Sequence, residues 1–254
     1  MGWKPMSQES RSQAIHGVMK MANVAIVTGG GSGVGRAVAL RLVKEGYKVG
    51  IVGRNVESLE ETAKLANNHS ILPLACDVGK AADVDDAAKT IESKLGPAKV
   101  LVAAAGLNIP KRSWEVINAA DYMSVIETNL NGTFNWVRAV LPGMRKLGDG
   151  TIVAIVSDAG LAASAKAGAA YVASKFGQRG MVQSINAEER QLGIRATAVL
   201  PGDINTPLLD KRPVPPPMEA RKGMLQPDDI VACVMLAIML PQRAIVEELL
   251  IRPR

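Results

Sequence analysis

Residues 23–46 read NVAIVTGGGSGVGRAVALRLVKEG, and this stretch decides the fold. The apolar run 23–28 predicts a short β-strand, the glycines after it predict a tight turn, and residues 36–45 have the apolar spacing of a helix. Glycines let a backbone approach a pyrophosphate closely, and the free N–H groups at the start of a helix attract an anion. A glycine-rich turn alone could be an ordinary loop, but between a strand and a helix it predicts a phosphate-binding site.

The rest of the chain repeats the alternation of strand and helix. We expect further strands at 48–52, 71–76, 100–104, 151–156, 194–200 and 246–251, and helices at 57–67, 81–95, 121–146, 168–191 and 227–240. Repeated βαβ units form parallel sheets that are covered by helices. The predicted fold class is therefore α/β: a single-domain, Rossmann-like, doubly wound parallel sheet of about seven strands, with helices on both faces.

Length and composition predict one domain without a metal site. A chain of 254 residues, 48% hydrophobic and only 3% aromatic, suits a layered α/β domain. We expect the domain to span 21–254, with a Pro-rich substrate loop at about 206–226, after a flexible N-terminal extension, 1–20. The extension could be an added leader, an upstream start or a weak targeting peptide. The cysteines and histidines, which are Cys76, Cys233, His16 and His69, are too few to predict disulfides or metal ligands.

The charge pattern argues against two classes of partner. The net charge of +6 comes from scattered basic residues without interleaved aromatics, which makes nucleic-acid binding a weak interpretation and suits a small anionic ligand. The longest apolar run, 230–240, is too short to span a bilayer, and no secretory pattern opens the chain. We therefore expect a cytoplasmic protein with reduced thiols and no membrane partner.

The end of the second predicted strand bears on the choice of ligand. In dinucleotide-binding folds, an acidic residue about 20 residues after the glycines bonds the ribose hydroxyls. Here Gly53, Arg54 and Asn55 occupy that place. A guanidinium beside the ribose suits a 2′-phosphate, so NADP is predicted over NAD. The alternative is an Arg that only begins a loop.

One Ser, one Tyr and one Lys have a spacing that suggests a proton-transfer site. Tyr171 and Lys175 lie four apart in a predicted helix, so their side chains share one face. A nearby ammonium favours the phenolate, and we expect it to lower the pKa of Tyr171. Ser157 follows a predicted buried strand, at the sheet edge where such folds bind their ligands. By themselves, a packed ring and a solvated charge would explain the Tyr and the Lys equally well.

Together these residues resemble the short-chain dehydrogenase/reductase family, in its short single-domain form, from about residue 21 to the end. The motifs are T-G-x-x-x-G-x-G at 28–35, Y-x-x-x-K at 171–175 and P-G at 201–202. The resemblance implies catalytic roles for Asn129, Ser157, Tyr171 and Lys175. It implies that the cofactor-binding residues are Thr28, Gly29, Gly31, Ser32, Gly33, Val34, Gly35, Arg54, Asn55, Asp77, Val78, Ala105, Gly106, Tyr171, Lys175, Pro201, Gly202, Ile204 and Thr206.

The chain departs from the family pattern at two places. Ala103 and Ala104 stand where the family usually has Asn after the fourth strand, which puts local hydrogen bonds in doubt. The interval from Ser157 to Tyr171 is one residue longer than the usual one, which a loop can absorb.

The resemblance implies an NADP(H)-dependent oxidoreductase that interconverts a small or medium carbonyl compound and its alcohol. Tyr171 would exchange the proton while Ser157 holds the substrate oxygen, and hydride would come from NADPH. Lys175 would tune the phenol and hold the nicotinamide ribose, and Asn129 would position Lys175 through a water. The family also suggests a homotetramer, or a homodimer, with the helices of Asn129 and Tyr171 at an interface.

Other functions remain open at this point. A non-catalytic NADP-binding regulator and an epimerase or dehydratase that retains its cofactor are the alternatives. By position, Asn108, Asp158 and Asp203 are expected near the substrate, and Arg112 makes an acidic substrate possible.

Overall fold

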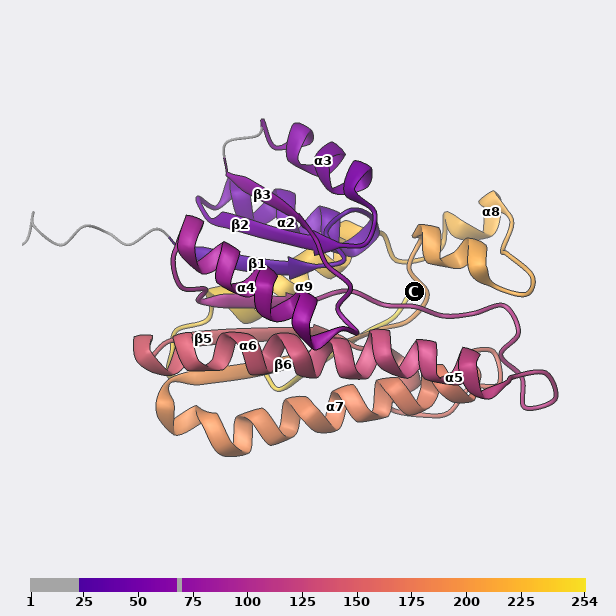
Figure 1. Cartoon of the computed structure of the whole chain (residues 1–254). Helices are drawn as coiled ribbons and strands as arrows, with labels where there is room; N and C mark the ends of the chain where they lie inside the picture. The colour runs from indigo at the N-terminus through magenta and orange to yellow at the C-terminus, as the bar shows by residue number, and fades with distance from the viewer. Residues whose placement is uncertain (1–22, 68–69) are drawn as a thin grey trace, which may run out of the picture.

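A computed structural model describes residues 23–67 and 70–254, and shows a seven-stranded parallel sheet of order β3-β2-β1-β4-β5-β6-β7 (Figure 1). The strands are β1 (Val24–Thr28), β2 (Lys48–Gly53), β3 (Ile71–Ala75), β4 (Val100–Ala103), β5 (Gly150–Ile155), β6 (Ile194–Pro201) and β7 (Glu248–Ile251). The predicted α/β fold class is therefore confirmed. The predicted N-terminal extension, 1–20, lies outside the described residues, so its prediction stays untested.

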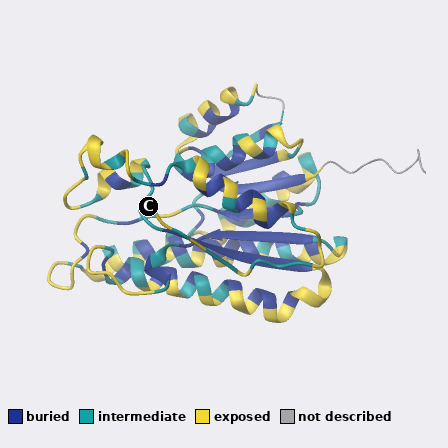
Figure 2. Cartoon of the chain, turned by 180° about the vertical axis from the view of Figure 1, so that it is seen from behind, coloured by how far each residue is buried: buried dark blue, intermediate teal, exposed yellow. Residues whose placement is uncertain are grey.

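Alternation along each strand sends side chains to two separate cores. In β1, Val24 and Ile26 pack into one core, whereas Ala25 and Val27 pack into the other. One face is covered by α2 (Gly33–Lys44), α3 (Val56–Leu65) and α9 (Pro227–Met239), and the other by α4 (Ala81–Leu95), α6 (Gly132–Leu147) and α7 (Ala169–Glu189). The central strands β1, β4, β5 and β6 are accordingly buried along their whole length, whereas the edge strands β3 and β7 are only partly buried (Figure 2). Within the described residues, no helix is long and apolar enough to cross a membrane.

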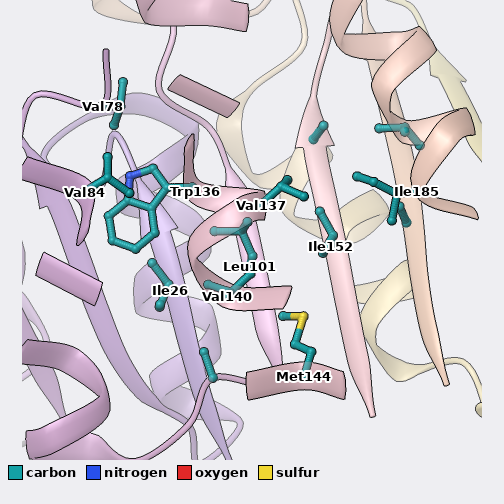
Figure 3. Packing of buried hydrophobic residues seen from close by; sticks show 14 of the residues in the cluster. Ile26, Val78, Val84, Leu101, Trp136, Val137, Val140, Met144, Ile152 and Ile185 are labelled. Atoms are coloured by element: carbon teal, nitrogen blue, oxygen red, sulfur yellow. The ribbon is translucent and has the colours of Figure 1, made fainter. Parts of the chain in front are cut away.

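The core beneath α6 is built around one large side chain. Trp136 is fully buried between the sheet and α4, among Ile26, Val84, Leu101 and Val140 (Figure 3). This packing fixes α6 against β1 and β4. It therefore also fixes the position, relative to the sheet, of the residues that precede α6.

The helix predicted at 121–146 is one continuous helical run with a change of hydrogen-bond pattern inside it. It consists of α5 (Ala119–Ile126), a π-helical turn η1 (Glu127–Asn131) and α6. The π turn contains Asn129, which is fully buried. Such turns often occur at functional sites because they reorient a side chain within a helix.

The predicted substrate loop at 206–226 contains two short helices. These are η4 (Pro207–Lys211) and α8 (Met218–Arg221), and α8 extends away from the sheet in Figure 1. A single β-bridge between Ile204 and Leu225 closes the base of this segment. The remaining short helices are η2 (Asp158–Gly160) and η3 (Arg190–Leu192).

A buried arginine joins β6 to the end of α9. All five N–H groups of Arg195 have acceptors: Nε donates to Thr151 Oγ1 (3.1 Å), and the other four donate to backbone carbonyls of Ile238, Leu240, Pro241 and Ala244 at 2.8–3.0 Å. A cation at a helix C-terminus also interacts favourably with the helix dipole. Arg195 therefore caps α9 and the turn that leads to β7.

Candidate active site

A cavity opens at the carboxyl ends of the central strands, because all strands of a parallel sheet end at the same edge. It is lined by segments that follow β1, β4, β5 and β6 and by the first turn of α7. The predicted site residues that line it are Gly29, Ser32, Gly33, Val34, Gly35, Ala105, Gly106, Ser157, Tyr171, Lys175, Pro201, Gly202, Ile204 and Thr206. Asn108, Asp158 and Asp203, expected near the substrate, also line it.

The glycine turn has the shape of a cradle that side chains would fill. Gly29 has a φ of +67°, and a Cβ there would lie 3.0 Å from the backbone N and Cα of Ala105. A Cβ on Gly35 would lie only 2.3 Å from the carbonyl O of Gly29. The side chain of Ser32, the N-cap of α2, accepts no hydrogen bond from the helix. The first N–H groups of α2 are therefore not capped by this side chain. This turn fits a pyrophosphate, which needs close approach and N–H donors.

Two side chains brace the turn from behind. Arg36 donates from Nη2 to the carbonyl O of Gly31 (2.6 Å) and from Nε to Thr62 Oγ1 (3.0 Å), and Thr62 donates to the carbonyl O of Gly30 (3.0 Å). These contacts were not predicted. Arg36 directly follows the glycine motif, but the sequence alone does not show that Thr62, on α3, lies beside it.

A hydrogen bond joins β1 to the segment after β4, although this chain lacks the Asn residues that the family usually has there. The amide N–H of Ala105 donates to Thr28 Oγ1 at 2.9 Å. Thr28 is buried and does not line the cavity, so its side chain supports the site rather than facing it. The doubt raised by Ala103 and Ala104 therefore does not extend to this contact.

Four predicted cofactor residues lie at the ends of β2 and β3, outside the cavity. Arg54 is exposed, and the Asn55 side chain accepts from Ser58 N (2.7 Å) as the N-cap of α3. Asp77 Oδ1 accepts from the amide of Gly79 (3.1 Å), and Val78 is buried against Gly132. The structure thus gives local roles to Asn55, Asp77 and Val78.

Tyr171 and Lys175 meet as their spacing predicted. Lys175 Nζ lies 5.4 Å from the centroid of the Tyr171 ring, and Ser157 follows β5 at the same cavity wall. Ser157 Oγ accepts from the amide of Ala159 (3.1 Å). Three groups that could act on one oxygen therefore line one cavity.

The prediction that the pKa of Tyr171 is lowered is wrong. Burial raises the pKa of Tyr171 to about 12, and a polar contact with the Ser157 hydroxyl opposes this rise only in part. Burial also lowers the pKa of Lys175 to about 7, so at neutral pH its side chain is partly the neutral amine. The sequence pattern showed the proximity of the pair but not its desolvation, which dominates both values.

Lys175 is held by side chains that were not predicted. Its Nζ donates to the carbonyl O of Ile155 (2.9 Å) and to Gln178 Oε1 (2.6 Å). Gln178 Nε2 donates to Thr133 Oγ1 (2.7 Å), which donates to the carbonyl O of Asn129 (2.8 Å). Gln178 is fully buried. A continuous chain of hydrogen bonds therefore joins Lys175 to the backbone of Asn129.

The side chain of Asn129 has other partners. Its Oδ1 accepts from Leu107 N (2.7 Å), and its Nδ2 donates to Leu107 O (3.0 Å) and Ser174 Oγ (3.0 Å). Asn129 thereby fixes the segment after β4 against α7. The connection that the structure shows from Asn129 to Lys175 starts at the Asn129 carbonyl and passes through Thr133 and Gln178, whereas the expected connection through a water stays a prediction.

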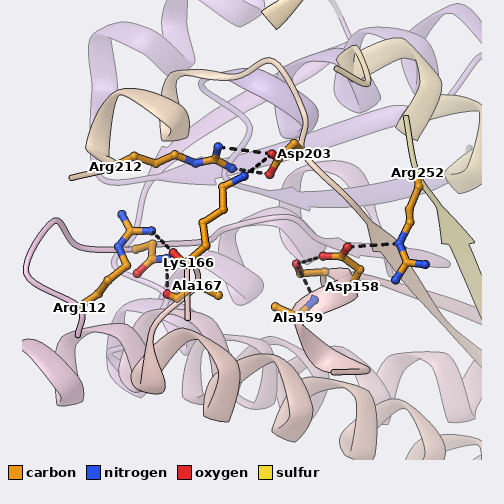
Figure 4. Close-up of polar contacts among 10 residues, drawn as sticks. Arg112, Asp158, Ala159, Lys166, Ala167, Asp203, Arg212 and Arg252 are labelled. Atoms are coloured by element: carbon orange, nitrogen blue, oxygen red, sulfur yellow. Dashed lines mark hydrogen bonds and ion pairs between the residues drawn. The ribbon is translucent and has the colours of Figure 1, made fainter. Parts of the chain in front are cut away.

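Charged side chains form the outer wall of the cavity (Figure 4). Asp203 accepts from Lys166 Nζ (2.7 Å) and pairs with Arg212, while Asp158 pairs with Arg252 (3.4 Å). Burial raises the pKa of Asp203, but the bonds from Arg212 and Lys166 outweigh it and lower the net value. The Lys166–Asp203 pair joins the segment before α7 to the segment after β6, and the Asp158–Arg252 pair joins η2 to the residues after β7.

Comparisons with known proteins agree with this geometry. A family described as short chain dehydrogenase matches residues 23–214. Glycine betaine reductase ATRR of Emericella nidulans is 32% identical, but the chain, matched over its full length, spans only 20% of that protein. An uncharacterized oxidoreductase of Staphylococcus aureus is 30% identical over 91% of this chain and 96% of its own length.

Solved structures give the same result. An alcohol dehydrogenase from the archaeon Thermococcus sibiricus, complexed with 5-hydroxy-NADP, is 29% identical with a TM-score of 0.81, covering 91% of this chain and 97% of its own. Other similar structures are complexed with NADP, NADPH or NADH. The chain belongs to the short-chain dehydrogenase/reductase family of oxidoreductases.

Proposed function

We propose that this protein interconverts a small or medium carbonyl compound and its alcohol, with Tyr171 as the general acid and base. The observation that carries this proposal is the convergence of Ser157 and Tyr171 on the cavity that also contains the glycine turn, with Lys175 beside the Tyr171 ring. A bound nicotinamide cofactor supplies or accepts the hydride. The residues of the chain do the remaining work, which is to orient the substrate oxygen and to move its proton.

The protonation states favour the reducing direction near neutral pH. Because the pKa of Tyr171 is raised to about 12, the phenol keeps its proton and can donate it to a carbonyl oxygen. The Ser157 hydroxyl holds that oxygen by a hydrogen bond as negative charge develops on it. Lys175, when protonated, stabilises the phenolate that remains after proton transfer. Oxidation needs the phenolate at the start and is therefore favoured at alkaline pH.

We propose NADP rather than NAD as the cofactor. Arg54 is exposed at the end of β2, in line with the glycine turn at the end of neighbouring β1, and within the described residues it has no acidic partner. A free guanidinium there can take a 2′-phosphate by charge-assisted hydrogen bonds. Several similar structures are complexed with NADP or NADPH, which supports this choice, and one is complexed with NADH.

We also propose that the protein forms a homotetramer or homodimer through the α5, α6 and α7 surface. Large apolar side chains are exposed there: Tyr122 and Met123 on α5, Phe134 on α6 and Phe176 on α7. Exposed apolar groups of this size favour a protein interface. Light scattering that shows a stable monomer at micromolar concentration would contradict it.

A substrate screen tests the proposed activity. Absorbance of the reduced nicotinamide is followed with NADPH and NADH in parallel, against aldehydes, ketones, oxo acids and quinones. Tyr171→Phe removes the proton donor but keeps the ring, so we expect a loss of about 100- to 10,000-fold in turnover with cofactor binding retained. Retained turnover in this variant would refute the assignment of Tyr171.

A further inference from the structure

The cavity beside Tyr171 has an excess of positive charge. Its lining includes the basic residues Arg112, Lys166, Lys175 and Arg212, and two carboxylates, Asp158 and Asp203. We infer that the substrate carries a carboxylate bound by Arg112, so that the protein reduces oxo acids and oxidises the corresponding hydroxy acids. This inference rests on the proposed function and names the class of its substrate.

Ion pairs neutralise only part of the other charges of the cavity. Lys166 and Arg212 share Asp203, and Asp158 is matched by Arg252. One positive charge remains on the group around Asp203, and a second remains on Arg112. Within the described residues, no carboxylate lies within ion-pair distance of Arg112. An anionic ligand would balance part of this excess positive charge.

Arg112 is buried although its charge has no acidic partner in the part of the chain that the structure describes. It is 7% exposed, and donates from Nε to Ile109 O (2.6 Å), from Nη1 to Lys166 O (3.3 Å) and from Nη2 to Lys211 O (2.8 Å). A guanidinium has five N–H donors, so two of them have no acceptor among the described residues. Burial, and then the positive charge of Arg212, lower the pKa of Arg112. Both effects disfavour the cation, and a bound carboxylate would relieve them.

The position of Arg112 suits a group on the same small molecule as the reacting carbonyl. Arg112 and Tyr171 line one cavity, and each influences the pKa of the other through its charge. Figure 4 shows Arg112 and Arg212 on one side of the site and Asp158 on the other. In the reduction, hydride from the reduced cofactor forms a C–H bond at the carbonyl carbon and Tyr171 gives a proton to the oxygen. The carboxylate is unchanged and serves only for binding.

A purely structural role for Arg112 makes a different prediction. Its three acceptors belong to three separate segments, so Arg112 also joins these segments. Loss of that support would weaken the reduction of every substrate alike. Loss of a carboxylate-binding site would weaken the reduction of acids alone.

The experiment compares 3-oxobutanoate and 4-oxopentanoate with their methyl esters, using NADPH and the full chain. We expect kcat/KM for the better acid to exceed that for its ester at least tenfold. In Arg112→Gln both substrates lose what the joined segments contribute, and the acid should lose at least tenfold more than the ester; Arg112→Lys should keep part of the preference. The matched control is Lys111→Gln, which removes an exposed neighbouring charge and should keep the preference in full.

A binding measurement makes the result independent of turnover. We expect 3-hydroxybutanoate to raise the melting temperature of the wild type saturated with NADP+, and not that of Arg112→Gln. Equal use of acid and ester by the wild type, or equal losses for both in Arg112→Gln, would overturn the inference while the proposed function stands. No turnover of any carbonyl compound would refute the proposed function, and the melting experiment would still decide whether a carboxylate binds.

Discussion

Replacing Gln178 by leucine should lower the pKa of Lys175 further. Gln178 Oε1 accepts a hydrogen bond from Lys175 Nζ at 2.6 Å, and both side chains are buried. This bond favours the ammonium form, so its loss favours the neutral amine. A hydrogen bond to a charged group contributes about 1.5–3 kcal/mol, and one pKa unit corresponds to about 1.4 kcal/mol. The expected shift is therefore about one to two units below the wild-type value of about 7.

This shift can be measured without a substrate. In protein labelled with ¹³C at lysine Cε, one resonance should titrate near pH 7, far below ordinary lysines, and disappear in Lys175→Met. That resonance should titrate at lower pH in Gln178→Leu and at higher pH in Gln178→Glu, because a carboxylate beside the ammonium stabilises its charge. Thermal unfolding of each variant checks that the fold is intact.

Two results would refute this reasoning. One is a wild-type Lys175 that titrates near its ordinary pKa, because burial would then not dominate its environment. The other is an identical titration in wild type and Gln178→Leu, because Gln178 would then not hold the ammonium.

Three further predictions concern the cofactor, the fold and the pH dependence. Arg54→Ser should raise the Kd for NADPH by about tenfold and leave that for NADH unchanged in a fluorescence titration; equal effects on both would contradict a 2′-phosphate contact. Arg195→Met removes all five hydrogen bonds of the guanidinium, of which those to Thr151 and Ile238 are buried, and should lower the free energy of unfolding in urea by about 3 kcal/mol, with Arg195→Lys losing less, and a loss below about 1 kcal/mol would argue against the cap. Reduction should weaken as pH rises through about 7 and Lys175 loses its proton, whereas oxidation should strengthen toward pH values near the Tyr171 pKa of about 12; coincident pH profiles for the two directions would count against these assignments.

The fold was predictable from the sequence because its periodicities are local. The strand at 24–28, the glycine turn and the helix after it are each encoded in a few neighbouring residues, and the βαβ alternation implies the parallel sheet. Element ends differed by a few residues, as for β7, which begins at Glu248 rather than at 246. The π turn around Asn129 was not predictable, because its hydrogen-bond pattern depends on how α5 and α6 pack against α7.

The site was predictable where its residues are close in sequence. Tyr171 and Lys175 share one helix, whereas Gln178 and Thr133 meet across two helices through contacts that only the packed structure brings together. The pKa values were mispredicted for the same reason, since burial is a property of the assembled core. The lack of an acidic partner for Arg112 also appears only when its neighbours from 109, 166 and 211 are known.

The most direct test of the central claim is the stoichiometry of NADPH consumed to alcohol formed, measured for wild type and Tyr171→Phe with the best carbonyl substrate. The account predicts one alcohol for each NADPH consumed by the wild type, and for the variant a rate of both changes that is lower by about 100-fold or more, although the variant still binds NADPH. Product formation without net loss of NADPH, or equal turnover by Tyr171→Phe, would contradict it.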